Sequence, residues 1–252
     1  MTDIISSSST RIKTGIALLI AFLIIGFIDS FLLTWIVLGV MMIIGLSEAM
    51  NLFRIDDDKI YLYAGIIWIA AAFYPKPEDL VFVTAIIFAS ILAYTKEFNT
   101  KLFFPLMYPI VSFLFLLSLY NSFGMSSLLW LVAIVAGTDV GAYFIGKSIG
   151  KTPFCETSPN KTLEGIVGGV VSSAILGLIF APESLGLFTA FILGLFISAA
   201  SIFGDLYESY LKREAEVKDS GDILPGHGGV LDRTDGFLFG GIIMLILLRF
   251  VS

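Results

Sequence analysis

The sequence has few charged residues, one cysteine and one histidine. Asp, Glu, Lys and Arg make up 14% of the 252 residues, whereas soluble domains usually carry about 25%. So few charges cannot cover a protein of this length with a polar surface, which excludes an ordinary soluble domain. The lone Cys155 excludes an intramolecular disulfide and a thiolate metal cluster. The net charge of −6 provides no basic field for nucleic acid.

Apolar residues recur along the whole chain instead. They make up 57% of it, and the mean hydropathy is +0.95. A transmembrane helix needs about 20 mostly apolar residues. The sequence predicts nine such segments, or eight crossings if the first two form a hairpin that does not fully cross. The segments are 14–28, 31–53, 60–74, 80–94, 102–120, 126–146, 165–181, 185–203 and 236–250.

This pattern predicts an all-α, polytopic integral membrane protein. We expect 1–252 to form a single membrane domain, with an N-terminal helical half over 1–125. The second half, 126–252, is expected to carry the catalytic helices and the cytoplasmic loops.

The distribution of basic residues predicts the orientation. Cytoplasmic loops of membrane proteins are enriched in Lys and Arg. With nine spans and a cytoplasmic N-terminus, 13 of the 15 basic residues fall on the cytoplasmic side, and only Lys76 and Arg249 fall outside. The 13 are Arg11, Lys13, Arg54, Lys59, Lys96, Lys101, Lys147, Lys151, Lys161, Lys212, Arg213, Lys218 and Arg233.

The loop over 204–235 stands apart because it holds a third of the 36 charged residues in about an eighth of the chain. If the preceding segment continues as a helix, one face carries Asp205, Glu208, Ser209 and Lys212. Such a face is either a solvated helix end or part of a polar site.

A glycine-rich stretch follows, with His227 between Pro225-Gly226 and Gly228-Gly229. Such a loop offers backbone N–H groups and close approach, so it can hold phosphate oxygens. The histidine is then either merely exposed or in contact with a ligand. Asp232 and Asp235 lie three residues apart where the last segment begins, and carboxylates suit Mg²⁺.

Two further features lie in or beside apolar segments. Gly165 and Gly169 form a small-xxx-small pattern, which favours close helix packing over ligand binding. Asp139 lies within an apolar segment, where an ionisable group is costly and usually functional. The alternative for Asp139 is a structural hydrogen bond between helices.

The charged stretches of the sequence resemble the conserved motifs of a known family. The pattern from Ser209 through Lys212-Arg213, Lys218-Asp219 and 224–229 to Asp232-Arg233-x-Asp235 is similar to the C-terminal signature of the CDP-diacylglycerol synthases, or phosphatidate cytidylyltransferases. The stretch 158–165 resembles their second conserved loop, and the segment around Asp139 and Tyr143 resembles a third. The resemblance covers about 137–250.

The resemblance implies a reaction in which CTP and phosphatidic acid give CDP-diacylglycerol and pyrophosphate, as a step of phospholipid biosynthesis. It implies Mg²⁺, together with K⁺, at a site on the cytoplasmic ends of the C-terminal helices of a cell (inner) membrane protein. The substrates would be CTP from the cytoplasm and a lipid in the leaflet, with no nucleic acid partner. Whether the chain is a monomer or a homodimer stays open.

The resemblance also assigns roles to residues. The metal ligands implied are Asp205 and Asp232, with Asp235, Asp219 and Glu208 as nearby candidates. The catalytic set is Asp205, Asp232, Asp235, Lys212, Lys218 and Asp219. The substrate-binding set is Ser158, Lys161, Thr162, Glu164, Ser209, Arg213, His227, Gly228, Arg233 and Asp139, the last either touching ligand or supporting the site. Asn160 stands where the family usually has a lysine, which leaves phosphate contact to Lys161.

Three other classes of membrane protein share some of these features. Asp232–Gly236 matches the opening of the CDP-alcohol phosphotransferase pattern, but that pattern needs further aspartates, and Phe237–Ser252 contains no acid. A related CTP-dependent enzyme acting on a polyprenyl or archaeal ether lipid phosphate stays open. A transporter is disfavoured because no internal repeat is visible and the polar residues gather at one membrane face.

Overall fold

The computed structural model describes residues 2–96 and 100–252, and side chains from residue 13 onward. Arg11, used above for orientation, therefore lies outside the described side chains. The described residues form helices and no β-strand. The helices are α1 (Thr2–Ile28), α2 (Phe31–Leu52), α3 (Lys59–Phe73), η1 (Pro77–Asp79), α4 (Leu80–Thr95), η2 (Thr100–Leu102), α5 (Phe103–Pro105), η3 (Leu106–Val111), α6 (Ser112–Ile149), α7 (Leu163–Ile179), α8 (Leu187–Glu214) and α9 (Leu231–Val251).

Every predicted apolar segment falls on helical structure. Among the described residues, five stretches are long and apolar enough to cross a membrane: α2, Pro77–Thr95, Thr100–Ile149, α8 and α9. Shorter apolar helices are Lys13–Ile28, α3 and α7. The predicted segments 102–120 and 126–146 both lie in Thr100–Ile149, which Gly124 interrupts with a left-handed φ of 73°. The chain is thus an all-α membrane protein, while the number of crossings and the orientation stay predictions.

Large apolar side chains on the helix surfaces agree with this class. Phe27, Phe73, Tyr94 and Phe250 are each at least 85% exposed. In water such exposure would be costly, whereas in lipid it costs nothing. The same lipid requires each backbone N–H and C=O to be satisfied within its own segment, which is why these runs form helices.

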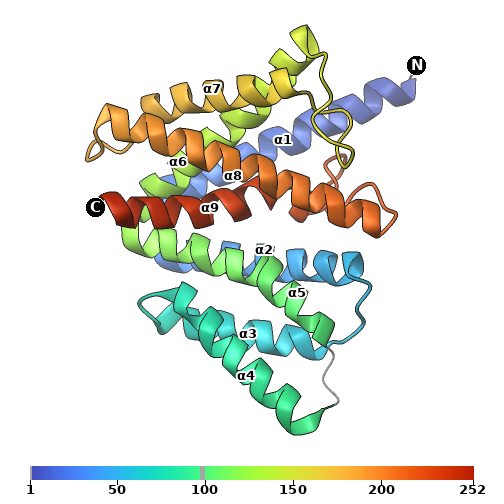
Figure 1. Cartoon of the computed structure of the whole chain (residues 1–252), viewed down its shortest axis with the longest axis vertical. Helices are drawn as coiled ribbons and strands as arrows, with labels where there is room; N and C mark the ends of the chain where they lie inside the picture. The colour runs from blue at the N-terminus through green and yellow to red at the C-terminus, as the bar shows by residue number, and fades with distance from the viewer. Residues whose placement is uncertain (1, 97–99) are drawn as a thin grey trace. The chain divides into compact units, whose positions relative to one another are not determined.

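One compact unit comprises 1–121 and 214–233. In it Trp35 of α2 and Trp68 of α3 stack with ring centroids 6.4 Å apart. Each indole N–H donates to the backbone oxygen of the other tryptophan, at 3.1 and 3.2 Å. Gly39 permits this approach, because a Cβ there would lie 2.3 Å from the Trp68 nitrogen. Figure 1 shows α3 and α4 side by side within this unit.

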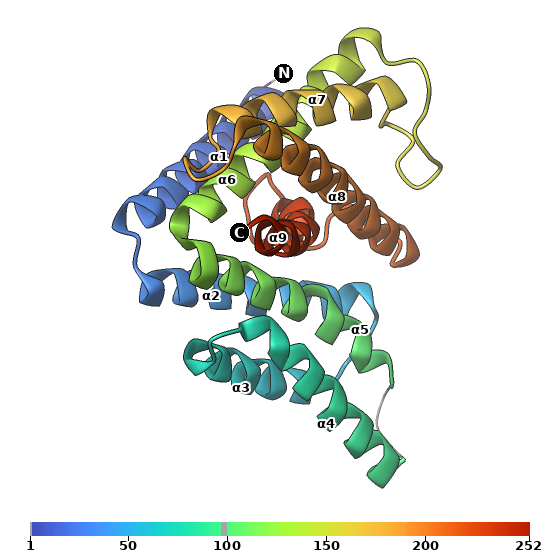
Figure 2. The ribbon, with the colours of Figure 1, turned by 60° about the vertical axis from the view of Figure 1, so that its left-hand side comes forward.

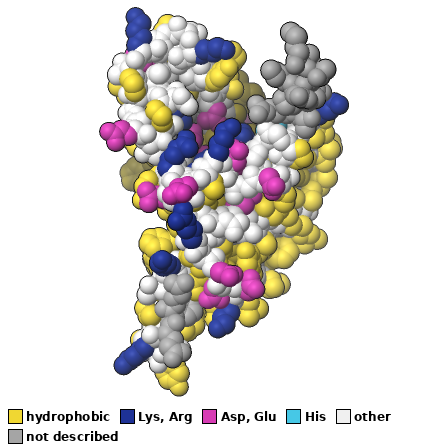
Figure 3. Space-filling view, turned by 90° about the vertical axis from the view of Figure 1, so that its right-hand side faces the viewer, with side chains coloured by type: hydrophobic (Ala, Val, Ile, Leu, Met, Phe, Trp, Pro, Cys, Tyr) yellow, Lys and Arg dark blue, Asp and Glu magenta, His cyan; other side chains and the backbone are white. Residues whose placement is uncertain are grey.

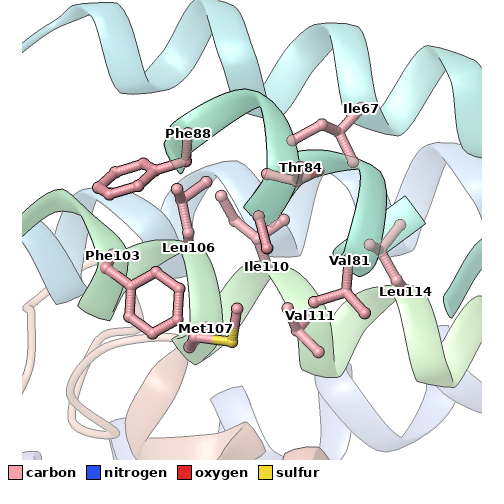
Figure 4. A pocket seen from close by; sticks show the side chains of 11 residues that line it. Ile67, Val81, Thr84, Phe88, Phe103, Leu106, Met107, Ile110, Val111 and Leu114 are labelled. Atoms are coloured by element: carbon pink, nitrogen blue, oxygen red, sulfur yellow. The ribbon is translucent and has the colours of Figure 1, made fainter. Parts of the chain in front are cut away.

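An apolar pocket lies inside the same unit (Figure 4). Its side chains come from α3, α4 and the segment running from α5 into α6. They are Ile67, Val81, Thr84, Ala85, Phe88, Phe103, Leu106, Met107, Ile110, Val111 and Leu114. Because none of these side chains is charged, the pocket is unsuited to phosphate and belongs to the apolar packing of the unit.

The other compact unit comprises 122–213 and 234–252. Figure 2 looks along α9, with α6 and α8 beside it. Two glycines of α7 allow it to pack closely on α6: a Cβ at Gly169 would lie 2.6 Å from the Thr138 backbone oxygen, and one at Gly165 would lie 2.9 Å from the Ala142 backbone oxygen. The close packing predicted for Gly165 and Gly169 is therefore confirmed. Hydrogen bonds add to it, from Trp130 Nε1 to the Gly177 oxygen at 2.8 Å.

Acidic and basic side chains are visible on the face drawn in Figure 3, together with hydrophobic side chains. The predicted halves, 1–125 and 126–252, divide the chain close to the point where α6 passes from one unit to the other. The segment 214–233 nevertheless groups with the N-terminal residues.

Candidate active site

A polar cavity of about 530 Å³ lies within the first unit. It is formed by the segment between α8 and α9 and the first turn of α9. The lining residues are Lys218, Asp219, Gly221, Asp222, Leu224, Gly226, His227, Gly228 and Arg233. Five of them are among the predicted site residues: Lys218, Asp219, His227, Gly228 and Arg233. The structure therefore brings these five together around one cavity.

The glycine-rich stretch is a tight turn. The N–H of His227 donates to the Leu224 oxygen at 2.8 Å, and the N–H of Leu224 donates to the Gly228 oxygen at 2.9 Å. Gly226 and Gly228 take left-handed φ values of 76° and 80°, which glycine adopts at no steric cost. Arg233 Nε donates to the His227 oxygen at 2.9 Å, so the guanidinium is held at the cavity.

The imidazole of His227 lies against α1. Nε2 of His227 would be 3.5 Å from a Cβ at Gly15, and Thr14 donates its hydroxyl to the Pro225 oxygen at 3.1 Å. Nδ1 of His227 is buried and has no hydrogen-bond partner among the described residues. A buried nitrogen of this kind is costly unless something binds it, which favours the ligand-contacting alternative for this histidine.

Asp232 organises the segment that precedes it. Its Oδ2 accepts hydrogen bonds from the Ser220 N–H at 2.8 Å, the Ser220 hydroxyl at 2.9 Å and the Gly229 N–H at 2.8 Å. A Cβ at Gly228 would lie 2.6 Å from the same oxygen. Asp232 sits in the first turn of α9, where the helix dipole favours a negative charge. Not all N–H groups of the glycine-rich loop are free for phosphate, because that of Gly229 is bound to Asp232.

Sequence reasoning missed Glu48, which lies near the end of α2 and is 6% exposed. Its carboxylate accepts hydrogen bonds from the N–H groups of Val230 and Leu231, both at 2.8 Å, and from the Ser220 hydroxyl at 3.1 Å. The signal was available, since Glu48 is a charged residue inside the predicted span 31–53. An ionisable residue within an apolar span is costly and usually functional, and this holds for Glu48 as it does for Asp139.

In the second unit, α8 carries the predicted polar face. The helix continues unbroken to Glu214, as that prediction required. Ser209 donates to Asp205 Oδ1 at 3.4 Å, and Lys212 donates to the buried Glu208 at 2.8 Å. Lys161 forms an ion pair with Asp205. The structure thus joins two predicted site residues from different loops.

Carboxylates gather around Asp235 of α9. Its electrostatic neighbours in the second unit are Glu208, Asp205 and Asp139. The donor chemistry of this set suits Mg²⁺. Within the described part of the chain, however, no three His, Cys, Asp or Glu side chains are arranged so that they could bind one metal ion. The assignment of metal ligands therefore stays a prediction.

The loop between α6 and α7 is held by its own residues. Thr162 caps α7 by accepting from the Gly165 N–H at 3.2 Å, and the Lys161 N–H donates to the Ser158 oxygen at 3.1 Å. Glu164 accepts from the N–H groups of Lys151 and Thr152 and from the Thr152 hydroxyl, at 2.9 to 3.3 Å. These bonds, with that from Lys151 foremost, lower the pKa of Glu164 to about 2. Ser158, Thr162 and Glu164 thus shape the loop, and their substrate contacts stay predictions.

Two predicted residues outside the cavity, Arg213 and Asp139, lie at exposed positions. Arg213 is on the last turn of α8, and Asp139 is on α6 among apolar neighbours. Asp139 interacts electrostatically with Asp235, and its contact with ligand stays a prediction.

Comparison with known proteins matches a family model over residues 9–251, the cytidylyltransferase family. Phosphatidate cytidylyltransferases of two Helicobacter pylori strains are 43% and 42% identical over 255 aligned residues, which cover 100% of this chain and 96% of each relative. A phosphatidate cytidylyltransferase of Bacillus subtilis is 44% identical over 136 residues, 52% of this chain and 51% of the relative.

Proposed function

We propose that this chain, which belongs to the cytidylyltransferase family, is a phosphatidate cytidylyltransferase. The observation that carries this function is the 43% identity to the Helicobacter pylori enzyme over the whole chain. CTP and phosphatidic acid are the substrates, and CDP-diacylglycerol and pyrophosphate are the products.

The chemistry requires little covalent work from the protein. A phosphate oxygen of phosphatidic acid forms a bond to the α-phosphorus of CTP, while the bond from that phosphorus to the pyrophosphate oxygen breaks. The electron pair of the broken bond leaves with pyrophosphate. The second pKa of a phosphate monoester is about 6, so the nucleophile is already anionic near neutral pH. Catalysis then depends on positioning and on neutralising charge.

The cavity of the first unit supports a role in binding phosphate groups. Its volume of about 530 Å³ is within the range of small-molecule sites. Lys218 and Arg233 supply positive charge at its wall, and His227 also lines it. In our proposal these cations offset the charge of the triphosphate, and the glycines allow phosphate oxygens to approach the backbone.

We also propose that the protein binds Mg²⁺, with K⁺ as a second cation. The carboxylates that we propose as metal ligands are Asp205, Glu208 and Asp235 in the second unit and Asp232 in the first, since this ion prefers carboxylate oxygens. When bound, the metal neutralises charge that develops on phosphate oxygens. Lys161 and Lys212 now pair with Asp205 and Glu208, and in our proposal Lys161 turns to phosphate when substrate binds.

We further propose that the site faces the cytoplasm at the cell (inner) membrane. The bias of 13 of the 15 basic residues toward one side supports this orientation. A nucleotide would then arrive from the cytoplasm, while the lipid stays in the leaflet.

The test is pyrophosphate release by purified protein in detergent micelles containing phosphatidic acid and Mg²⁺, with each nucleoside triphosphate supplied in turn. We expect release only with CTP and lipid together. Asp232→Asn should reduce it roughly 10–100-fold, because it removes charge from a proposed metal ligand. Asp56→Asn is the control, since Asp56 is an exposed carboxylate of the α2–α3 loop. No release with any nucleotide, from folded protein, would contradict the proposal.

A further inference from the structure

We propose that Glu48 is a positioning residue for cytidylyl transfer, an inference that rests on the proposed function. Its carboxylate holds the segment 220–231 in the shape that forms the cavity. Through Ser220 it also sets the orientation of Asp232.

The location of Glu48 argues against an incidental role. It is buried at 6% exposure at the end of an otherwise apolar helix. A carboxylate in such a place is costly unless several donors compensate it. Glu48 has three donors, all from the segment that lines the cavity or begins α9.

Two of these donors are backbone groups at the start of α9. The first N–H groups of a helix lack partners within the helix, and here Val230 and Leu231 donate to separate oxygens of Glu48 at 2.8 Å. Glu48 therefore acts as the N-terminal cap of α9, although it belongs to α2. An anionic cap at this end is also favoured by the helix dipole.

The glycines around the carboxylate are shaped to admit it. A Cβ at Gly229 would lie 2.5 Å from both Glu48 oxygens, and one at Gly221 would lie 2.7 Å from Oε1. Side chains at these positions would displace the carboxylate. Two glycines of the charged loop are thus explained by Glu48, not by phosphate.

The Ser220 hydroxyl links Glu48 to Asp232. Its oxygen lies 3.1 Å from Glu48 Oε2 and 2.9 Å from Asp232 Oδ2, and it accepts from the Asp232 N–H at 3.3 Å. A change at Glu48 therefore reaches the proposed metal ligand through one side chain. This connection distinguishes a positioning role from simple support of the fold.

The test compares Glu48→Gln with Glu78→Gln. Glutamine keeps the size of Glu48 but has one acceptor oxygen for two N–H donors, so one hydrogen bond to α9 is lost. Glu78 is an equally buried acid of the same unit, 6% exposed, on η1. We expect Glu48→Gln to lower kcat roughly 10–100-fold and to raise the Mg²⁺ concentration for half-maximal rate, with KM for phosphatidic acid unchanged. Glu78→Gln should keep all three constants.

A double-mutant cycle with Ser220→Ala tests the link. If Glu48 acts through the Ser220 hydroxyl, the double variant should be no slower than Glu48→Gln alone, because the two effects are not additive. Full additivity would contradict the link. Wild-type kcat in Glu48→Gln would overturn the inference while leaving the proposed function intact.

Amide exchange provides a readout independent of turnover. Loss of the acceptor should speed hydrogen exchange at Val230 and Leu231 in Glu48→Gln but not in Glu78→Gln. Unchanged exchange at both amides would also overturn the inference. If wild type and Glu78→Gln both lack CTP turnover, the proposed function fails, and the exchange result still decides whether Glu48 holds the segment.

Discussion

The two charged loops of this protein are held in shape by different means. In the loop between α6 and α7, Glu164 binds Lys151 and Thr152, which are 13 and 12 positions away. In the segment between α8 and α9, Glu48 binds residues 172 to 183 positions away. Apart from the ion pair of Lys161 with Asp205, the first loop is therefore held by local bonds, whereas the second also depends on how α2 packs.

The two carboxylates that hold these loops, Glu48 and Glu164, also differ in burial. Glu48 is buried, whereas Glu164, at the start of α7, is only half-buried. Leaving a buried donor or acceptor without its partner costs more than leaving an exposed one, because water replaces only the exposed bond. Changes near Glu48 should therefore have larger effects than changes near Glu164.

The largest effect is expected from Gly229→Ala. A Cβ there would lie 2.4 Å from the Ser220 hydroxyl and 2.5 Å from both oxygens of Glu48. The carboxylate cannot withdraw without losing its bonds to α9, so kcat/KM should fall roughly 10–100-fold. The rate of pyrophosphate release at varied substrate concentrations measures this fall in kcat/KM.

Gly65→Ala is the matched control, because a Cβ at this position in α3 has nothing within 4 Å. Alanine in a helix interior is about 1 kcal/mol better than glycine, so this variant should be at least as stable as wild type. Equal activity of the two variants would contradict the role of Gly229.

An intermediate effect is expected from Lys161→Ala in the local loop. Hydrogen bonds to charged groups contribute about 1.5–3 kcal/mol, and about 1.4 kcal/mol is tenfold in rate. If Lys161 contacts phosphate, kcat/KM should fall at least about tenfold. The loop itself should survive, because its bonds through Thr162 and Glu164 do not involve the lysine side chain.

Steady-state kinetics and amide exchange at Thr152 and Leu163 check both parts of this prediction. Lys151→Ala is the control, as the bond of Lys151 to Glu164 uses its backbone N–H. Faster exchange at both amides in Lys161→Ala would show that the loop is not locally held, and wild-type kinetics would exclude a phosphate contact.

The smallest effect is expected from Glu164→Gln, and it depends on pH. The pKa of Glu164 is lowered from 4.5 to about 2. The ionised form therefore stabilises the loop above pH 4.5, and this contribution is lost as the pH falls toward about 2. Exchange at the Lys151 and Thr152 amides should be slower in wild type than in the variant at neutral pH, and the difference should shrink below pH 4.5.

Glu183→Gln, at an exposed position between α7 and α8, should show no such pH dependence. A difference that stays constant down to pH 2 would exclude the titration of Glu164 as its cause.

Much of the fold was predictable because it depends on local sequence. The apolar segments, the continuation of α8 to Glu214 and the close approach at Gly165 and Gly169 all follow from hydropathy or helical spacing. The break at Gly124 within Thr100–Ile149 agrees with the two segments predicted there.

The candidate site was predictable in its residue types but not in its contacts. Lys218, His227 and Arg233 were expected together and do share a cavity. The bonds of Asp232 to Ser220 and Gly229 were not expected, because the same spacing is compatible with a carboxylate facing a metal. The charge of Glu48 inside a predicted span was visible in the sequence, but nothing near it in sequence identifies its partners Val230 and Leu231.

The sequence by itself determined the class of this protein: helical, embedded in a membrane, with its charged chemistry in two loops. Those properties follow from local composition, since lipid forces each apolar segment to satisfy its own backbone. Only the tertiary structure decided that Glu48 caps α9 and that two glycines make room for it. Contacts between residues so far apart in the chain depend on how helices pack, which no local pattern encodes.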